Sequence, residues 1–208
     1  MDQETARQAL LDGGRRLGAR GLISAAEGNL SVRIDDARLL VTPAGRRKDE
    51  LKPDDLVEVR LGHDERAQRS RTGLAPTSDL AIHLAVLAAR PDAAAVVHAH
   101  LPASMALTVA GEIPDPSILP ETAQQLPRVP FVAAGEMGSD ELAVRIAAAF
   151  ADGREPPAGA VLLERHGAYA IGPDVRTAVD RLELLEVLCR TWRDALLLRA
   201  ARNAIDRG

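Results

Sequence analysis

Two histidines that stand two residues apart in an apolar segment constrain the fold of this chain more than any other feature. His98 and His100 lie within the run 95–101, whose alanine, valine and leucine residues predict a β-strand. Residues i and i+2 of a strand point to the same face, so the two imidazoles can bind one divalent metal ion. The alternative is a pair of buried histidines that bond to backbone carbonyl groups.

A third histidine and a carboxylate extend this pattern. His166 follows the apolar run 160–163 and precedes Gly167, which predicts a strand, a tight turn and a second strand. Asp79 lies in the predicted first turn of a helix capped by Ser78, where the helix dipole favours an anion. An ordinary first-turn carboxylate is the alternative for Asp79. Three histidines and one carboxylate are together typical of an open zinc site.

Composition excludes several classes of function. The net charge of −4 and the pI near 5.8 argue against a nucleic-acid partner, and an aromatic content of 2% argues against base stacking. No apolar run reaches the roughly 18 residues of a membrane span, and the N-terminus lacks the features of a signal peptide. We therefore expect a cytoplasmic protein that forms one domain over residues 1–208. Its single cysteine, Cys189, excludes an internal disulfide and is expected to be a buried thiol.

Helical and strand patterns alternate along the chain, which predicts an α/β or α+β fold. The polar segment 62–73 predicts an exposed loop that includes His63. Five prolines in 111–130 predict a long irregular connection. Helices are predicted over 3–20, 78–90 and 139–151 and from 174 to beyond 199. Strands are predicted over 30–34, 39–41, 56–59, 95–101, 160–163 and 168–172.

Three loops carry residues suited to binding a phosphate group. A glycine such as Gly28 or Gly45 lets the backbone approach a ligand, and the free N–H groups at a helix N-terminus attract anions. The alternative for each loop is an ordinary turn with no ligand. The basic side chains at 46–48 either add positive potential to the site or are simply solvated. The candidate residues are Gly28, Asn29, Gly45, Thr77 and Ser78.

Taken together and in order, these segments resemble the class II aldolase/adducin family, typified by L-fuculose-1-phosphate aldolase. The resemblance covers nearly the whole chain and implies a three-layer α/β/α domain with a mostly antiparallel central sheet. It also implies a homotetramer with active sites at subunit interfaces, and a zinc ion bound by His98, His100 and His166. The matching segments are 28–33, 42–45, 76–83, 96–100 and 162–167.

The resemblance also implies how the site works. Asn29, Ala44–Gly45 and Thr77–Ser78 would cradle the substrate phosphate, and Asp79 would serve as both metal ligand and proton acceptor. The implied activity is that of a zinc-dependent aldolase, with manganese or cobalt as alternative metals. It would cleave a sugar phosphate to dihydroxyacetone phosphate and an aldehyde through a metal-stabilised enediolate.

Two departures from the family pattern leave the reaction open. The family's aldolases and dehydratases favour Glu where this chain has Asp79, whereas Ser-Asp is the pattern of the related ribulose-5-phosphate 4-epimerase. Tyr169 matches neither tyrosine of fuculose-phosphate aldolase, so the tyrosine expected as general acid is missing. Glu121 is the one ionisable candidate for this role in 117–125. The alternative for Glu121 is a plain carboxylate at the start of a helix. His83 is expected to be a packed or capping histidine. The alternative functions are a pentulose-phosphate 4-epimerase, a methylthioribulose-1-phosphate dehydratase, an enzyme for a non-phosphorylated substrate, and a noncatalytic adducin-like binding protein.

Overall fold

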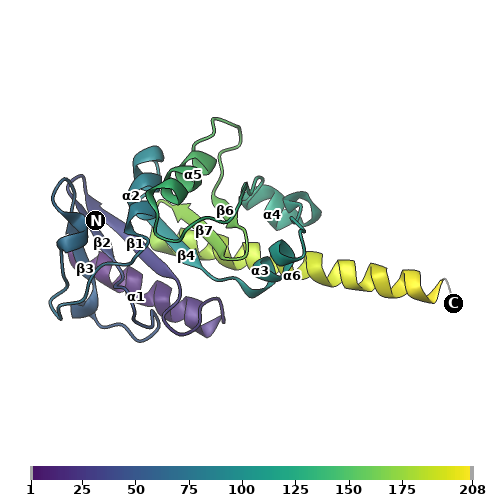
Figure 1. The fold of residues 1–208 in the computed structure, drawn as a ribbon, viewed down its shortest axis with the longest axis horizontal. Helices are drawn as coiled ribbons and strands as arrows, with labels where there is room; N and C mark the ends of the chain where they lie inside the picture. Colours follow the sequence, from purple (N-terminus) through teal and green to yellow (C-terminus); the bar gives the residue numbers. More distant parts are fainter. Residues whose placement is uncertain (1, 207–208) are drawn as a thin grey trace.

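The computed structural model describes residues 2–206, which form a seven-stranded sheet with helices on both faces (Figure 1). The strand order is β3-β2-β1-β4-β7-β6-β5, and every neighbouring pair is antiparallel except β5 and β6. This confirms the expected α/β/α architecture with a mostly antiparallel sheet. The strands are β1 (Asn29–Asp35), β2 (Arg38–Val41), β3 (Val57–Arg60), β4 (Ala95–Ala99), β5 (Phe131–Val132), β6 (Ala160–Leu163) and β7 (Gly167–Gly172).

Two hydrophobic cores lie on opposite faces of the sheet. Helices α1, α3 and α6 cover one face, and α2 and α5 cover the other. Strand alternation divides each strand between the two cores, so that on β4 Val97 belongs to the first and Val96 to the second. The helices are α1 (Gln3–Ala19), α2 (Leu80–Ala89), α3 (Pro102–Val109), α4 (Pro120–Gln125), α5 (Asp140–Phe150) and α6 (Val175–Ile205).

Three of the helices, α1, α5 and α6, begin with a side-chain cap, whereas α2, α3 and α4 do not. Asp2, Ser139 and Asp174 each accept a hydrogen bond from a backbone N–H in the first turn of α1, α5 and α6. The prediction that Ser78 caps α2 is wrong, because Asp79 occupies the N-cap position and its side chain makes no capping bond. The Asp79 carboxylate is instead turned toward the sheet.

The connection 111–130 is more ordered than its prolines suggest. It contains a 3₁₀ turn over Pro116–Ile118 and the short helix α4, which packs against α6. The segment 62–73 is mostly exposed, including His63, as predicted. Cys189 is fully buried on α6, also as predicted. Within residues 2–206, no helix combines the length and apolarity that crossing a membrane would require.

The turn between β6 and β7 brings the chain unusually close to the end of β4. Gly167 has a φ of +102°, and a Cβ atom added to it would lie 2.2 Å from the carbonyl oxygen of Ala99. Only glycine permits that approach, because any side chain would overlap this backbone oxygen. The contact fixes His166, which precedes Gly167, beside the end of β4.

Substitution of Gly167 by alanine is expected to destabilise the fold and disturb the turn. We expect G167A to lower the free energy of unfolding by about 2–4 kcal/mol, since it adds both a steric overlap and an unfavourable φ. G21A is the matched control, because Gly21 has a φ of +66° but no heavy atom within 4 Å of an added Cβ. It should lose only about 1–2 kcal/mol. Equal losses in urea denaturation of the two variants would contradict the close-approach argument.

Candidate metal centre

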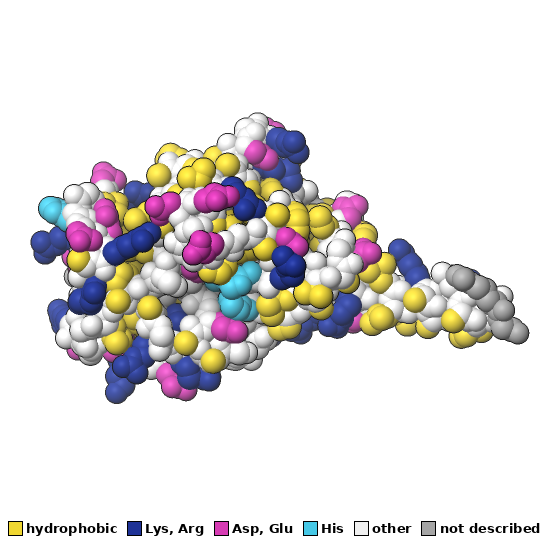
Figure 2. Space-filling model, viewed as in Figure 1, with side chains coloured by type: hydrophobic (Ala, Val, Ile, Leu, Met, Phe, Trp, Pro, Cys, Tyr) yellow, Lys and Arg dark blue, Asp and Glu magenta, His cyan; other side chains and the backbone are white. Residues whose placement is uncertain are grey.

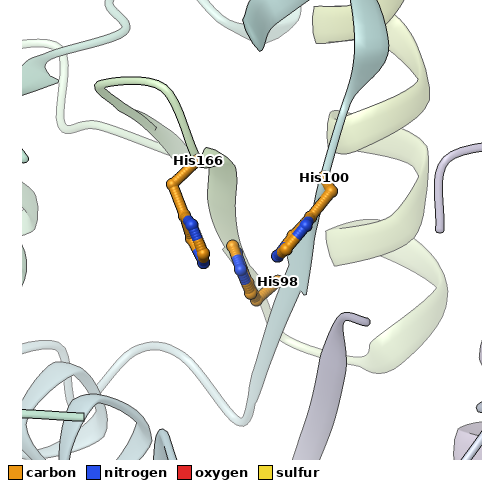
Figure 3. Close-up of side chains that lie close together, drawn as sticks. All are labelled: His98, His100 and His166. Carbon is orange, nitrogen blue, oxygen red and sulfur yellow. The ribbon is translucent and has the colours of Figure 1, made fainter. Parts of the chain in front are cut away.

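Three histidines from separate segments converge at one end of the sheet. His98 lies on β4, His100 follows the end of that strand, and His166 lies in the turn between β6 and β7. One ring nitrogen from each can be chosen so that all three lie within 4.8 Å of one another. Figure 3 shows the three rings pointing toward a common centre. A single metal ion can therefore contact all three imidazoles.

The hydrogen bonding of His98 leaves one nitrogen free to bind a metal. Its Nδ1 donates to the carbonyl oxygen of Ala168 at 2.9 Å, which requires the proton on Nδ1 and the lone pair on Nε2. Within residues 2–206, Nε2 of His98 is the one fully buried side-chain nitrogen or oxygen without a hydrogen-bond partner. Burial, together with the neighbouring imidazoles, lowers the pKa of His98 to about 3. This neutral, unpartnered nitrogen fits a metal ligand.

The other two imidazoles are also held in place. His100 Nδ1 lies 3.3 Å from Oε1 of Glu27, a carboxylate contact that orients histidine ligands in metal sites. Burial and the adjacent His100 lower the pKa of His166. The ring centroids of His98 and His166 are 5.2 Å apart in nearly parallel planes. Three imidazoles arranged in this way form a donor set suited to zinc or a similar divalent ion.

Asp79 lies in the same pocket, but its carboxylate is held by neighbours other than the three histidines. Its Oδ2 accepts hydrogen bonds from Asn29 Nδ2 at 2.8 Å and from the Tyr169 hydroxyl at 3.0 Å. Burial opposes ionisation, but the neighbouring His98 and these donors outweigh it and lower the pKa of Asp79 below its ordinary value. Asp79 is outside the set of mutually close ligand atoms. It is therefore placed as an ionised group beside the three-histidine cluster.

The predicted phosphate-binding loops meet the histidines in one pocket of about 210 Å³. The loop at Ala44 lies beside the start of α2 because backbone hydrogen bonds link Ala44 to Ala75 and Thr77 to Thr42. All ten residues predicted from the sequence line this pocket, and Ala26, Glu27 and Met137 complete it. The predicted ten are Gly28, Asn29, Ala44, Gly45, Thr77, Ser78, Asp79, His98, His100 and His166. In the space-filling view, histidine side chains reach the surface near the middle of one face (Figure 2).

The cations that follow the Ala44–Gly45 loop differ in their surroundings. Arg46 and Arg47 are exposed, but Lys48 is almost completely buried and donates to the carbonyl oxygens of Ala26 and Arg46. Burial lowers the pKa of Lys48 to about 8. Lys48 thus braces the backbone behind the pocket instead of being solvated.

Tyr169 was given no role at this site from the sequence, and His83 was expected only to pack or to cap. Tyr169 pairs directly with His98 across β4 and β7, and its ring stacks on the His98 ring with centroids 4.1 Å apart. His83 is fully buried and hydrogen-bonds to Ser31 and Asn29, so the expectation of a packed histidine holds. Glu121, the candidate general acid, is exposed in the first turn of α4 and does not line the pocket. The pairing of Tyr169 with His98 depends on strand register, which no local pattern reveals.

A model of the class II aldolase and adducin N-terminal domain matches residues 8–193. The chain belongs to the class II aldolase and adducin family. The methylthioribulose-1-phosphate dehydratase of Acidiphilium cryptum is 35% identical over 84% of this chain and 83% of its own length. The 5-methylthioribulose-1-phosphate/5-deoxyribulose-1-phosphate aldolase of Rhodospirillum rubrum is 34% identical over 90% of this chain and 80% of its own length. Among solved structures, L-fuculose-1-phosphate aldolase of Thermus thermophilus is 28% identical, with a TM-score of 0.80. The match covers 94% of this chain and 96% of the aldolase chain. Decarboxylases also occur among the relatives.

Removal of any one of the three histidines is expected to weaken metal binding. H98A, H100A and H166A should each lower the affinity for zinc or cobalt by about 100-fold, since each ligand supplies a share of the binding free energy. Calorimetric titration with zinc measures this effect. H63A is the control, because His63 is exposed and does not line the pocket, and this variant should bind zinc like the unaltered protein. Unchanged affinity in H98A would contradict the assignment.

Proposed function

We propose that this protein is a metal-dependent lyase that removes water from a ketose 1-phosphate, and that methylthioribulose 1-phosphate is the substrate to test first. The sequence alone ranked an aldolase first and a dehydratase among the alternatives. Four of the relatives are named methylthioribulose-1-phosphate dehydratases, which supports the dehydratase alternative. Zinc stays the first choice of metal, with manganese and cobalt as alternatives.

The observation that carries this proposal is the unpartnered Nε2 of His98 in a pocket that also contains an ionised carboxylate. His98, His100 and His166 would hold the metal, which as a Lewis acid would polarise the substrate carbonyl. Asp79 would accept a proton from the carbon next to that carbonyl. Its Oδ2 already has two donors, so Oδ1 is the oxygen available for this role.

The chemistry of dehydration can be balanced on the substrate. In a 2-ketose with hydroxyl groups on C3 and C4, the proton leaves C3 and the C4–O bond breaks. The departing hydroxide takes up a proton to become water, and the resulting enol rearranges to a 2,3-diketone. The backbone around Gly28 and Gly45 and the hydroxyls of Thr77 and Ser78 would bind the phosphate and so hold C3 near Asp79.

An aldolase would use the same substrate differently. Cleavage of the C3–C4 bond begins with removal of the proton from the C4 hydroxyl, whereas dehydration begins with removal of the proton from C3. The two reactions therefore differ in which substrate atom lies against the Asp79 carboxylate. Because Asp is one methylene shorter than Glu, its reach differs by roughly 1.5 Å, one C–C bond length. Both the aldolases and the dehydratases of the family favour Glu at this position, so the shorter reach of Asp79 does not separate the two reactions, and the products do.

The proposal is tested by product analysis with zinc-loaded protein and 5-methylthioribulose 1-phosphate. We expect a diketone phosphate in the NMR spectrum, and loss of turnover with chelator. D79N should lower kcat by about 100-fold or more, because it removes the proton acceptor. The same variant should keep the three histidine ligands and retain zinc. Release of dihydroxyacetone phosphate would support the aldolase instead, and no turnover with zinc bound would contradict both.

We also propose that the protein is cytoplasmic and assembles into a homotetramer. The C-terminal half of α6 extends beyond the body of the molecule (Figure 1), and Leu197, Leu198 and Ile205 on it are largely exposed. Apolar side chains on a projecting helix favour contact with another subunit. This arrangement is consistent with an active site completed by a neighbouring copy.

A further inference from the structure

The two oxygens of the Asp79 carboxylate have different environments. From the described residues 2–206, Oδ2 receives two hydrogen bonds, one from Asn29 and one from Tyr169, and Oδ1 receives none. Because Oδ1 is not among the fully buried unpartnered atoms within residues 2–206, it is open to the pocket. The neighbouring side chains thus select which oxygen can meet a ligand.

The orientation of the Asn29 amide is fixed by what lies on each side of it. The ionised Asp79 carboxylate can only accept, so the amide nitrogen faces Asp79 and the amide oxygen faces His83. The distance from His83 Nε2 to that oxygen is 2.6 Å, so Nε2 carries a proton. His83 Nδ1 then accepts from the Ser31 hydroxyl at 2.7 Å. Burial lowers the pKa of His83 to about 4, which keeps the ring neutral.

This directional chain has a consequence for the base. If the proton of His83 were on Nδ1, Nε2 would accept and the Asn29 amide would turn over. The amide oxygen would then face the Asp79 carboxylate, and one of its two donors would be replaced by a repulsive contact. The proton position on His83 therefore determines how Asp79 is held, although His83 does not line the pocket.

Tyr169 links the base to the metal cluster. Its hydroxyl donates to Asp79, and its ring stacks on His98 at an interplanar angle of 13°. The His166 ring is also nearly parallel to that of His98, with an interplanar angle of 9°. Tyr169 is fully buried, so it can hold both neighbours in one arrangement.

We propose that His83 and Tyr169 are positioning residues that hold the Asp79 carboxylate so that Oδ1 alone faces the pocket. Neither touches the ligand space, and both act through named contacts: His83 through Asn29, and Tyr169 directly. The expected effect of His83 and Tyr169 on kcat rests on the proposed function. The expected proton positions on His83 and His98 do not depend on it.

The proton positions are measurable without a substrate. Long-range 1H–15N spectra of zinc-loaded protein labelled at histidine should show His83 protonated on Nε2 and His98 on Nδ1. The signals of His83 are assigned by their absence in H83Q. A neutral His83 with its proton on Nδ1 would overturn the proposal whatever reaction the protein catalyses.

The kinetic arm separates positioning from folding. Y169F removes only the hydroxyl and H83L removes the N–H donor, so we expect each to lower kcat by about 10- to 100-fold with little change in KM. H83Q places an amide N–H near the position of Nε2 and should recover most of the loss. H63L, at an exposed histidine, is the matched control.

Three outcomes of the kinetic arm have distinct meanings. A kcat within twofold of the unaltered protein in both Y169F and H83L would overturn the positioning role. Equal losses in H83L and H83Q would overturn the donor argument for His83. If the unaltered protein turns over no ketose phosphate but the spectra show the expected proton positions, the proposed function fails and the carboxylate network stands.

Discussion

Antiparallel pairing of β4 with β7 is the constraint on which the site depends. The register sets Tyr169 opposite His98, and Gly167 lets the turn before β7 pack against the backbone at Ala99. These two facts place His166 beside His98 on β4 and His100 just after it. A register shift of one residue would turn Tyr169 to the opposite face and separate it from both His98 and Asp79.

Burial then determines the chemistry of the groups that the sheet brings together. An imidazole removed from water stays neutral, so His98 keeps a lone pair for a metal at any ordinary pH. The same burial makes each hydrogen bond directional and costly to break. Asp79 is held by two donors on one oxygen, and the network behind it leaves the other oxygen toward the pocket. The site thus combines a Lewis-acid position with a fixed proton acceptor.

Much of the fold and of the pocket followed from local patterns. Apolar periodicity located the starts of α1, α5 and α6 to within a few residues, and short apolar or alternating runs located β1 and β4. The start of α2 was misplaced by one residue because Asp79 binds Asn29 and Tyr169 across the sheet instead of capping its own helix. The six-residue helix α4 and the two-residue strand β5 were missed because fewer than two helical turns, or two strand residues, show no repeat.

The sequence by itself determined which chemical groups the protein holds: three histidines, one short carboxylate and loops suited to an anion. Their order and spacing also sufficed to identify the family. Only the tertiary structure decided which oxygen of Asp79 is free, which nitrogen of His83 carries its proton, and that Tyr169 belongs to the site. Those features depend on contacts between residues 50 to 90 positions apart, and such contacts are set by strand register and packing, which leave no local pattern in the chain.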